Sequence, residues 1–272
     1  MVPDRLGLLP PGARDAAFDL GAMLQRRGLL PFRLAGRRSL LLPRDPSQID
    51  AYYHRLAHYS FRLVLRDLIA HPGAPAERLT TFCSPATITR HLAFLERLGT
   101  VEPWEAGFRL TASVRSFGGT LEWFVAELLR RECAAQTLWG VRVKGRETGG
   151  DYDVLAQVEH ELVYVEVKAS PPKHVDQRDV AAFLSRTADL APHVAIFFVD
   201  TELRMLDKIV PLFEAGLAAR SSVSSRVAEP VLRLRDELFH IDRRIFIVNS
   251  KRDIAKNFKD CLRAYWRGLL RV

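Results

Sequence analysis

The chain has 272 residues, of which 48% are hydrophobic and 26% are charged, so it is neither fibrous nor disordered and is long enough for two domains with a core each. No segment approaches the roughly 20 apolar residues that a membrane-spanning helix needs. The N-terminus lacks the basic start and apolar run of a secretory signal, so we expect a cytoplasmic protein with no membrane partner. The three cysteines include no CxxC pair, which argues against a disulfide framework and a zinc knuckle.

The formal net charge of +8 is unevenly distributed along the chain. Residues 1–116 contain 16 arginines, no lysine and 10 acidic residues, a net charge of +6, whereas residues 117–272 contribute +2. A basic surface attracts phosphates, because neutralising them releases bound counterions. The uneven charge therefore fits a nucleic-acid partner for the N-terminal part.

Residues 1–49 are expected to form an extension before the first domain. Apolar residues at helical spacing predict a helix over residues 13–28. Two short apolar runs on either side of Gly36 predict a hairpin that ends at Pro43. The sequence indicates no function for this extension.

Residues 50–116 follow the order helix, helix, helix, hairpin, which is typical of a winged helix-turn-helix domain. A long first helix is predicted over residues 50–70, and the Pro and Gly within residues 71–73 end it. A short second helix is predicted over residues 76–82. After the third helix, a turn between two short strands within residues 101–111 would form the wing.

The third helix of this domain has a strong start signal. Ser84 can cap its N-terminus, and Pro85 suits its first position. Apolar residues at helical spacing would face the core, which leaves Thr87, Thr89 and Arg90 outward, where a recognition helix contacts the major groove of DNA. The alternative is a protein–protein or dimerisation module. The basic excess in the same half of the chain favours DNA.

A linker over residues 116–119 is expected to lead into the second part of the chain. A helix over residues 120–134 and a strand over 138–143 come first. A second strand begins near Asp153, and a third covers residues 162–168. The three strands and their helix would form the core of one α/β domain.

Polar residues occupy one face of the last predicted strand. Valines at every second position alternate with Tyr164, Glu166 and Lys168, so the period of two places Glu166 and Lys168 on the same face. A turn at residues 159–161 would fold this strand against the one that begins at Asp153. Asp153 and Glu166 can therefore approach the same ion.

Carboxylates in this arrangement suit a divalent cation, Mg²⁺ or Mn²⁺, because they hold it while leaving positions open for water and a phosphate oxygen. Asp153 and Glu166 would be ligands, and the main-chain carbonyl of Val167 could supply a further oxygen. Lys168 is placed to orient an attacking water, lower its pKa and stabilise the charge that develops on the phosphate. The pattern indicates phosphodiester hydrolysis.

These residues resemble the PD-(D/E)XK nuclease superfamily, in which an Asp precedes a strand whose neighbour carries Glu-x-Lys. The matching segments are Gly150–Val154 and Val165–Lys168. Residues 119–125 are similar to the acidic helix of archaeal Holliday-junction resolvases, of Mrr-like restriction enzymes and of CRISPR ancillary nuclease domains. The resemblance spans roughly residues 117–200.

The resemblance implies an α/β fold, with an α/β/α restriction-endonuclease-like core and a mixed central sheet within residues 117–272. It implies that Glu122 supplies an extra carboxylate to the metal. It also implies that Gln177, on the helix after the Glu-x-Lys strand, assists the site.

The sequence leaves open which acidic residues bind the metal and whether the polar face is catalytic. Asp151 competes with Asp153 for the metal, although the apolar run directly after Asp153 favours the latter. Glu127 competes less well with Glu122, because it lies about 140° further round the helix. Glu166 and Lys168 could also form a solvated polar face with no catalytic role.

The C-terminal part is less informative. A strand over residues 243–248 is expected, as another edge of the same sheet. Residues 252–270 predict an amphipathic helix whose stripe is either core or a dimer seam. The stripe consists of Ile254, Phe258, Leu262, Tyr265 and Leu269.

The sequence therefore favours a metal-dependent deoxyribonuclease that a winged helix directs to DNA, with a place in genome defence or restriction. A homodimer would suit an enzyme that cuts two strands. The first alternative is an RNA-cleaving CRISPR-type ancillary nuclease, switched on by a small effector or an activating protein. The second is a winged-helix DNA-binding regulator with an inactive nuclease-like scaffold.

Overall fold

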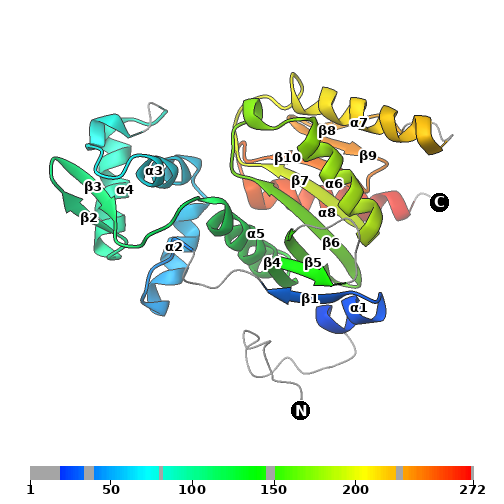
Figure 1. Cartoon of the computed structure of the whole chain (residues 1–272), viewed down its shortest axis with the longest axis horizontal. Helices are drawn as coiled ribbons and strands as arrows, with labels where there is room; N and C mark the ends of the chain where they lie inside the picture. Colours follow the sequence, from blue (N-terminus) through cyan, green and yellow to red (C-terminus); the bar gives the residue numbers. More distant parts are fainter. Residues whose placement is uncertain (1–18, 34–39, 80–81, 145–150, 225–228, 271–272) are drawn as a thin grey trace, which may run out of the picture.

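An eight-stranded mixed sheet organises the C-terminal part of this computed structural model (Figure 1). The structure describes residues 19–33, 40–79, 82–144, 151–224 and 229–270. The strand order is β1-β4-β5-β6-β7-β10-β9-β8, in which β6–β7 and β7–β10 pair in parallel and the other neighbours are antiparallel. The strands are β1 (Leu30–Arg33), β4 (Gln136–Lys144), β5 (Asp151–Val158), β6 (Glu161–Lys168), β7 (Val194–Val199), β8 (Leu232–Arg235), β9 (Leu238–Ile241) and β10 (Ile245–Asn249).

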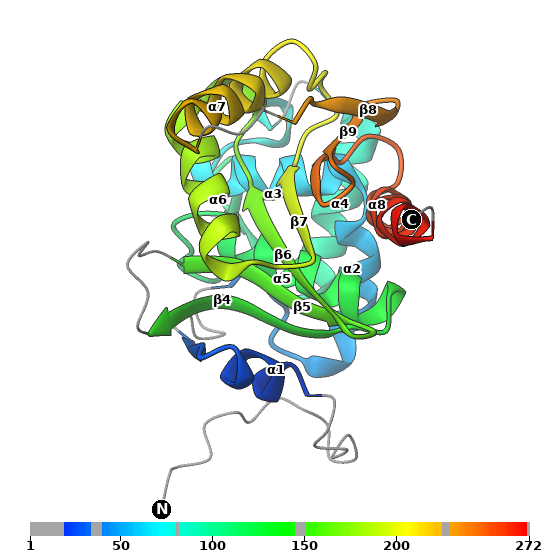
Figure 2. The same ribbon diagram turned by 90° about the vertical axis from the view of Figure 1, so that its right-hand side faces the viewer.

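Helices cover both faces of this sheet (Figure 2). One face packs against α5 (Gly118–Glu132) and α8 (Ile254–Leu269), and the other against α6 (Gln177–Leu190) and α7 (Ile209–Ser224). The strands β5, β6, β7, β9 and β10 are buried on both sides, because each of them contributes residues to both cores. The expected mixed α/β architecture is confirmed, and none of the helices in the described residues is both long and apolar enough to cross a membrane.

The N-terminal extension joins the edge of this sheet. The expected helix appears as α1 (Leu20–Arg26), while residues 13–18 lie outside the described residues. The expected hairpin around residues 32–42 is wrong, because β1 pairs antiparallel with β4, a partner more than 100 residues away. Residues 40–42 are not a strand, and the N–H of Leu41 donates to Oγ1 of Thr120 on α5 at 2.9 Å.

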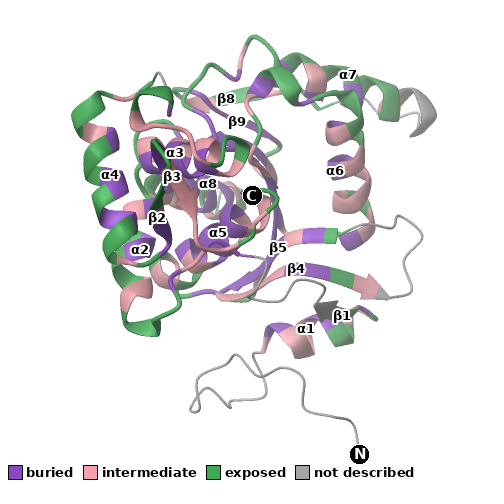
Figure 3. Cartoon of the chain, turned by 60° about the vertical axis from the view of Figure 1, so that its left-hand side comes forward, coloured by how far each residue is buried: buried purple, intermediate pink, exposed green. Residues whose placement is uncertain are grey.

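The helical part of the chain consists of α2 (Ile49–Leu56), α3 (Tyr59–Ala70), α4 (Pro85–Arg97) and a hairpin of β2 (Val101–Trp104) and β3 (Gly107–Leu110). The third predicted helix and the hairpin are confirmed, with Ser84 Oγ accepting the N–H of Thr87 as a cap at 3.2 Å. Buried and exposed residues alternate along α4, so one side of it faces outward (Figure 3). The second predicted helix is reduced to the 3₁₀ turn Ala76–Arg78, with residues 80–81 outside the described residues.

The predicted helix over residues 50–70 is split into α2 and α3. His58 has an extended backbone, with φ −82° and ψ 123°, which interrupts the helix. The guanidinium of Arg62 donates to the carbonyls of Leu56 and Ala57 and so satisfies the end of α2. Because these carbonyls at the end of α2 are hydrogen-bonded, the break between α2 and α3 costs little free energy.

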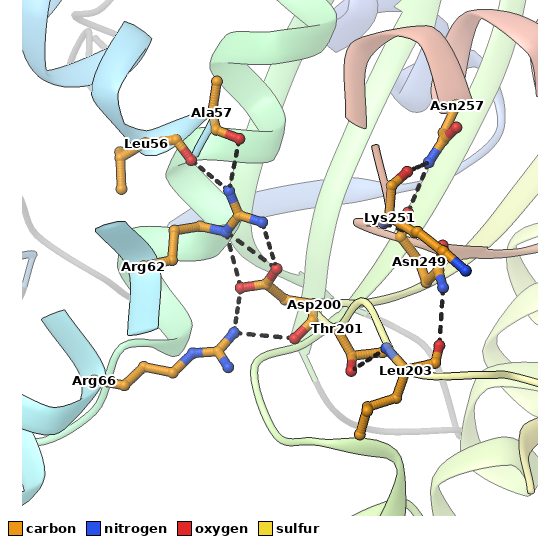
Figure 4. Close-up of polar contacts among 10 residues, drawn as sticks. All are labelled: Leu56, Ala57, Arg62, Arg66, Asp200, Thr201, Leu203, Asn249, Lys251 and Asn257. Atoms are coloured by element: carbon orange, nitrogen blue, oxygen red, sulfur yellow. Dashed lines mark hydrogen bonds and ion pairs between the residues drawn. The ribbon is translucent and has the colours of Figure 1, made fainter. Parts of the chain in front are cut away.

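Arg62 also attaches this helical part to the sheet (Figure 4). Its Nη2 donates to Oδ1 of Asp200, directly after β7, at 2.7 Å, and both side chains are fully buried. Arg66 donates from the next turn of α3 to the same carboxylate. Two arginines therefore neutralise one buried acid where α3 meets the carboxyl end of β7.

The C-terminal elements complete the sheet. The predicted strand over residues 243–248 is β10, but it lies between β7 and β9 rather than at an edge. Two strands that were not predicted from the sequence, β8 and β9, extend the sheet beyond β10. Along α8, Ile254, Phe258, Leu262 and Tyr265 are buried in the core, and Leu269 is exposed, so the stripe is core.

Candidate active site

The β5–β6 hairpin brings Asp153 against the Glu-x-Lys segment. Ladder pairing between these strands ends with Val154 opposite Val165. Beyond that pair, Oδ2 of Asp153 accepts the N–H of Val167 at 2.7 Å. The carboxylate therefore takes the place of a strand hydrogen bond and lies beside the residue that follows Glu166.

A break in strand alternation directs Asp153 to this position. Tyr152 and Leu155 both enter the core on the α6 side, although they are three residues apart, while Val154 enters the opposite core. Gly140 lies between the β4 partners of Tyr152 and Val154, opposite Asp153, and has a φ of 56°. A left-handed glycine allows the local twist that a residue with a side chain would resist.

Glu166 is only 3% exposed and its two oxygens have different partners. Its Oε2 accepts from Nη2 of Arg186 at 2.7 Å and from the hydroxyl of Tyr164. Its Oε1 lies 3.2 Å from Nζ of Lys168. The hydroxyl of Tyr164 also accepts from Nε of Arg186 at 2.9 Å.

Lys168 lies between two carboxylates. Its Nζ is 2.7 Å from Oδ1 of Asp179, near the start of α6, and 3.2 Å from Glu166. Partial burial lowers the pKa of Lys168, but the negative charges of Glu166 and Asp179 outweigh it, so the pKa is raised overall. Lys168 is a cation at neutral pH and acts as a donor rather than a base.

Three carboxylates in this region repel one another. Burial, together with the charges of Asp151 and Glu166, raises the pKa of Glu122 to about 7. Burial also raises the pKa of Asp153 well above its usual range, with further contributions from Glu166 and Glu122. A fold that holds acids together against this repulsion favours a bound cation.

The competing acids have other partners. Asp151 is exposed and pairs with Nε of Arg142 on β4. Glu127 accepts from Arg130 and Arg131, the latter at 3.0 Å. Both acids are therefore engaged in ion pairs with arginines, although the charge of Asp151 still acts on Glu122.

The oxygen atoms of this group are the type of ligand that a hard divalent cation prefers. Asp153, Glu166 and Glu122 offer carboxylate oxygens. Because the N–H and C=O of a strand residue face the same neighbour, the carbonyl of Val167 is directed to the side of Asp153. Within the described ranges, no three His, Cys, Asp or Glu side chains already surround one cation position, so metal binding requires their side chains to adjust.

Gln177 is not brought to this group. Its Nε2 donates to the carbonyl of Leu212 on α7 at 3.1 Å. Asp179, two residues further on and about 200° round the helix, faces the site instead.

Three site residues were missed by the sequence reasoning. Tyr164 has the same strand parity as Glu166 and could have been found from that. Asp179 belongs to a capping box with Asp176, a local pattern that suggests a helix start but not a contact with Lys168. No local signal identified Arg186.

The three residues expected to contact nucleic acid lie together on α4. Thr89 and Arg90 are exposed and Thr87 is half-buried. Nη2 of Arg90 donates to Oγ1 of Thr87 at 3.2 Å, and Oγ1 of Thr89 donates to the carbonyl of Pro85 at 3.0 Å. On the hairpin, Trp104 is 42% exposed, an aromatic surface that the sequence reasoning did not single out.

Fold and site together define a mixed α/β protein with a partly buried Asp-Glu-Lys group at the open end of an antiparallel hairpin. No protein-family model and no curated protein sequence matches the chain. Among solved structures, protein VC1899 from Vibrio cholerae is similar at 16% identity and a TM-score of 0.49, over 91% of this chain and 61% of that one. Can2 from Sulfobacillus thermosulfidooxidans, in complex with cyclic tetra-adenylate, is similar at 13% identity and a TM-score of 0.47, over 82% and 57%.

The chain thus spans about three fifths of the length of each of these two proteins. Similarity at this level identifies neither the fold family nor the activity of the chain.

Proposed function

We propose that the chain is a metal-dependent nuclease of the PD-(D/E)XK type that hydrolyses phosphodiester bonds, with DNA as its substrate. The observation that carries the proposal is the 2.7 Å hydrogen bond from the Val167 N–H to Asp153. It joins the start of β5 to the Glu166-x-Lys168 segment of β6. Two carboxylates and a lysine are thereby collected at one end of a hairpin, a set that can hold a divalent cation and stabilise charge on a reacting phosphate.

Asp153, Glu166, Glu122 and the carbonyl of Val167 would hold Mg²⁺ or Mn²⁺. When bound, such an ion polarises a phosphate oxygen and activates a water. The mutual repulsion of the carboxylates supports this assignment, because bound positive charge would relieve it.

Lys168 would hold its proton and donate it as a hydrogen bond to the reacting phosphate. The charge that develops on the phosphate oxygens in the transition state is negative, and a fixed cation stabilises it without reorganisation. The contact with Asp179 at 2.7 Å restricts the ammonium group to the neighbourhood of Glu166. We infer electrostatic stabilisation as its main role.

The helical part would act as a winged helix that binds the duplex. The outward face of α4 carries Thr87, Thr89 and Arg90, and the basic excess of the chain lies in the same part of the sequence. Because Arg62 and Asp200 attach α3 to the sheet, DNA bound on α4 would have a defined position relative to Glu166. A homodimer remains a prediction.

The proposal is tested by incubating the purified chain with plasmid DNA, single-stranded DNA and RNA in Mg²⁺, Mn²⁺ or EDTA. We expect cleavage with metal only. Glu166→Ala removes a metal ligand and Lys168→Ala removes preorganised transition-state charge, so each should lose about 10²–10³-fold in activity. Glu127→Ala is the matched control, since it removes an acid of α5 that pairs with arginines. Cleavage that survives both site variants would contradict the proposal.

The same assay separates the alternatives. An RNA-cleaving or effector-activated nuclease keeps this active site and differs in substrate and switch, so the reactions are repeated with cyclic tetra-adenylate. A chain that stays inert with each of these substrates, with and without the effector, yet shifts duplex DNA in a gel, favours a DNA-binding regulator or a nuclease that an activating protein must switch on.

A further inference from the structure

One face of α6 lies over the Glu-x-Lys segment. Asp179 and Arg186 are seven residues apart, so they differ by only about 20° around the helix. Phe183 lies between them and stacks on Tyr164, with ring centroids 5.6 Å apart and an interplanar angle of 29°. The aromatic pair therefore fixes the distance between helix and strand, with a charged residue on either side.

Each of these two charged residues of α6 pairs with a residue of opposite charge on β6. Asp179 contacts Lys168 at 2.7 Å, and Arg186 contacts Glu166 at 2.7 Å. Asp179 is in turn tied to the start of the helix, because its Oδ2 accepts the N–H of Asp176 at 3.0 Å. The side chains of Arg186 and Glu166 are 14% and 4% exposed, so both charges depend on this pairing.

As a result, the two carboxylate oxygens of Glu166 have different hydrogen-bond partners. Oε2 accepts from both Arg186 and Tyr164, whereas Oε1 has Lys168 as its neighbour. A cation that approaches Glu166 would meet Oε1, because Oε2 is already held by two donors. The ligand would then be monodentate with a fixed direction.

We propose that Asp179 and Arg186 are positioning residues: Arg186 directs Glu166 as a metal ligand, and Asp179 directs Lys168 toward the reacting phosphate. The inference rests on the proposed nuclease function. It assigns different roles to the two residues, so substitution of Arg186 and substitution of Asp179 should impair different measured properties.

The test measures binding of MnCl₂ to the full chain by calorimetry and, separately, cleavage kinetics at saturating Mn²⁺. We expect Arg186→Met to weaken Mn²⁺ binding by about 10–100-fold, the range found when a partner of a metal ligand is removed, and Arg186→Lys to restore most of the loss. We expect Asp179→Asn to leave Mn²⁺ affinity within about twofold, while kcat falls roughly tenfold and KM is unchanged.

Two controls separate positioning from general destabilisation of α6. Asp176→Ala removes the helix cap, which accepts from the N–H groups of Arg178 and Asp179, but keeps the contact with Lys168. Arg178→Gln removes an exposed charge from the same turn. Both are expected to keep Mn²⁺ affinity and kcat within about twofold of wild type, since neither side chain touches the site.

Each outcome decides something. Unchanged or tighter Mn²⁺ binding in Arg186→Met overturns the role of Arg186, since loss of a nearby positive charge alone would tighten binding. An equal fall of kcat in Asp176→Ala and Asp179→Asn overturns the role of Asp179. If wild type binds Mn²⁺ but cuts nothing, the nuclease function fails while the binding measurement still decides on Arg186; if it neither binds nor cuts, both proposals are overturned.

Discussion

Single buried ionisable side chains determine much of the chemistry of this protein. Glu166 is only 3% exposed, and its Oε2 accepts hydrogen bonds from Tyr164 and Arg186. His91 on α4 is a contrasting case, since it is 4% exposed and its ring Nε2 lies 2.9 Å from Oγ of Ser60. Burial, followed by the charges of Arg55, His58 and Arg90, lowers the pKa of His91 to about 4.

Stability should therefore depend on pH through His91. Between the folded pKa of about 4 and the unfolded value near 6.5, the unfolded chain binds a proton that the folded chain does not, so stability falls as the pH falls. We expect the free energy of unfolding in urea to drop between pH 7 and pH 5 by roughly 1–2 kcal/mol more in wild type than in His91→Gln. An equal drop in the two proteins would show that His91 does not titrate in this way.

At the scale of the element, the backbone of β4 controls the position of a site residue on β5. Gly140 has a φ of 56° opposite Asp153. A Cβ in the left-handed region costs about 1–2 kcal/mol. Relief of that strain would change the local twist that turns Asp153 toward Val167.

We expect Gly140→Ala to lower the free energy of unfolding by about 1–2 kcal/mol and to reduce cleavage beyond the loss of folded protein. Gly28→Ala is the matched control, because Gly28 also has a positive φ, 71°, and an added Cβ would meet nothing within 4 Å. The control should lose similar stability and keep its specific activity. Equal specific activities in the two variants would show that the conformation of Gly140 does not affect the site.

Several elements could be predicted from the sequence because their signals are local. The Ser84-Pro85 start of α4 and the alternation of β6 residues between the two cores involve neighbouring residues, and both are confirmed. The pairing of β1 with β4 could not be predicted, because a strand edge accepts many partners and only packing selects one. The break between α2 and α3 was missed for a related reason, since its carbonyls are satisfied by Arg62.

At the scale of the whole molecule, one buried ion group joins the helical part to the sheet. Asp200 accepts from Arg62 and Arg66, which lie more than 130 residues away in sequence. The burial of Arg62 could not be predicted from the sequence, because an arginine within a helix is normally exposed. Without Asp200, two guanidinium groups at this junction would lose their carboxylate.

We expect Asp200→Asn to lower the free energy of unfolding by about 3–5 kcal/mol, the usual consequence of removing one partner of a buried ion pair. Asp50→Asn is the control, since the ion pair of Asp50 with Arg131 leaves Asp50 69% exposed and solvent screens such a pair, so its loss should have much less effect. Urea denaturation of the three proteins measures both effects. Similar losses in the two variants would mean that the Asp200 group does not hold the parts together.

The sequence by itself determined the periodic elements and the spacing of Asp153, Glu166 and Lys168, because strand period and hairpin closure act between near neighbours. Only the tertiary structure decided which groups neutralise these charges. Asp179 and Arg186 reach β6 from a separate helix, and Gln177 turns to α7 instead. Such contacts arise from the packing of whole elements, and a single long-range ion pair has no repeat along the chain by which it could be recognised.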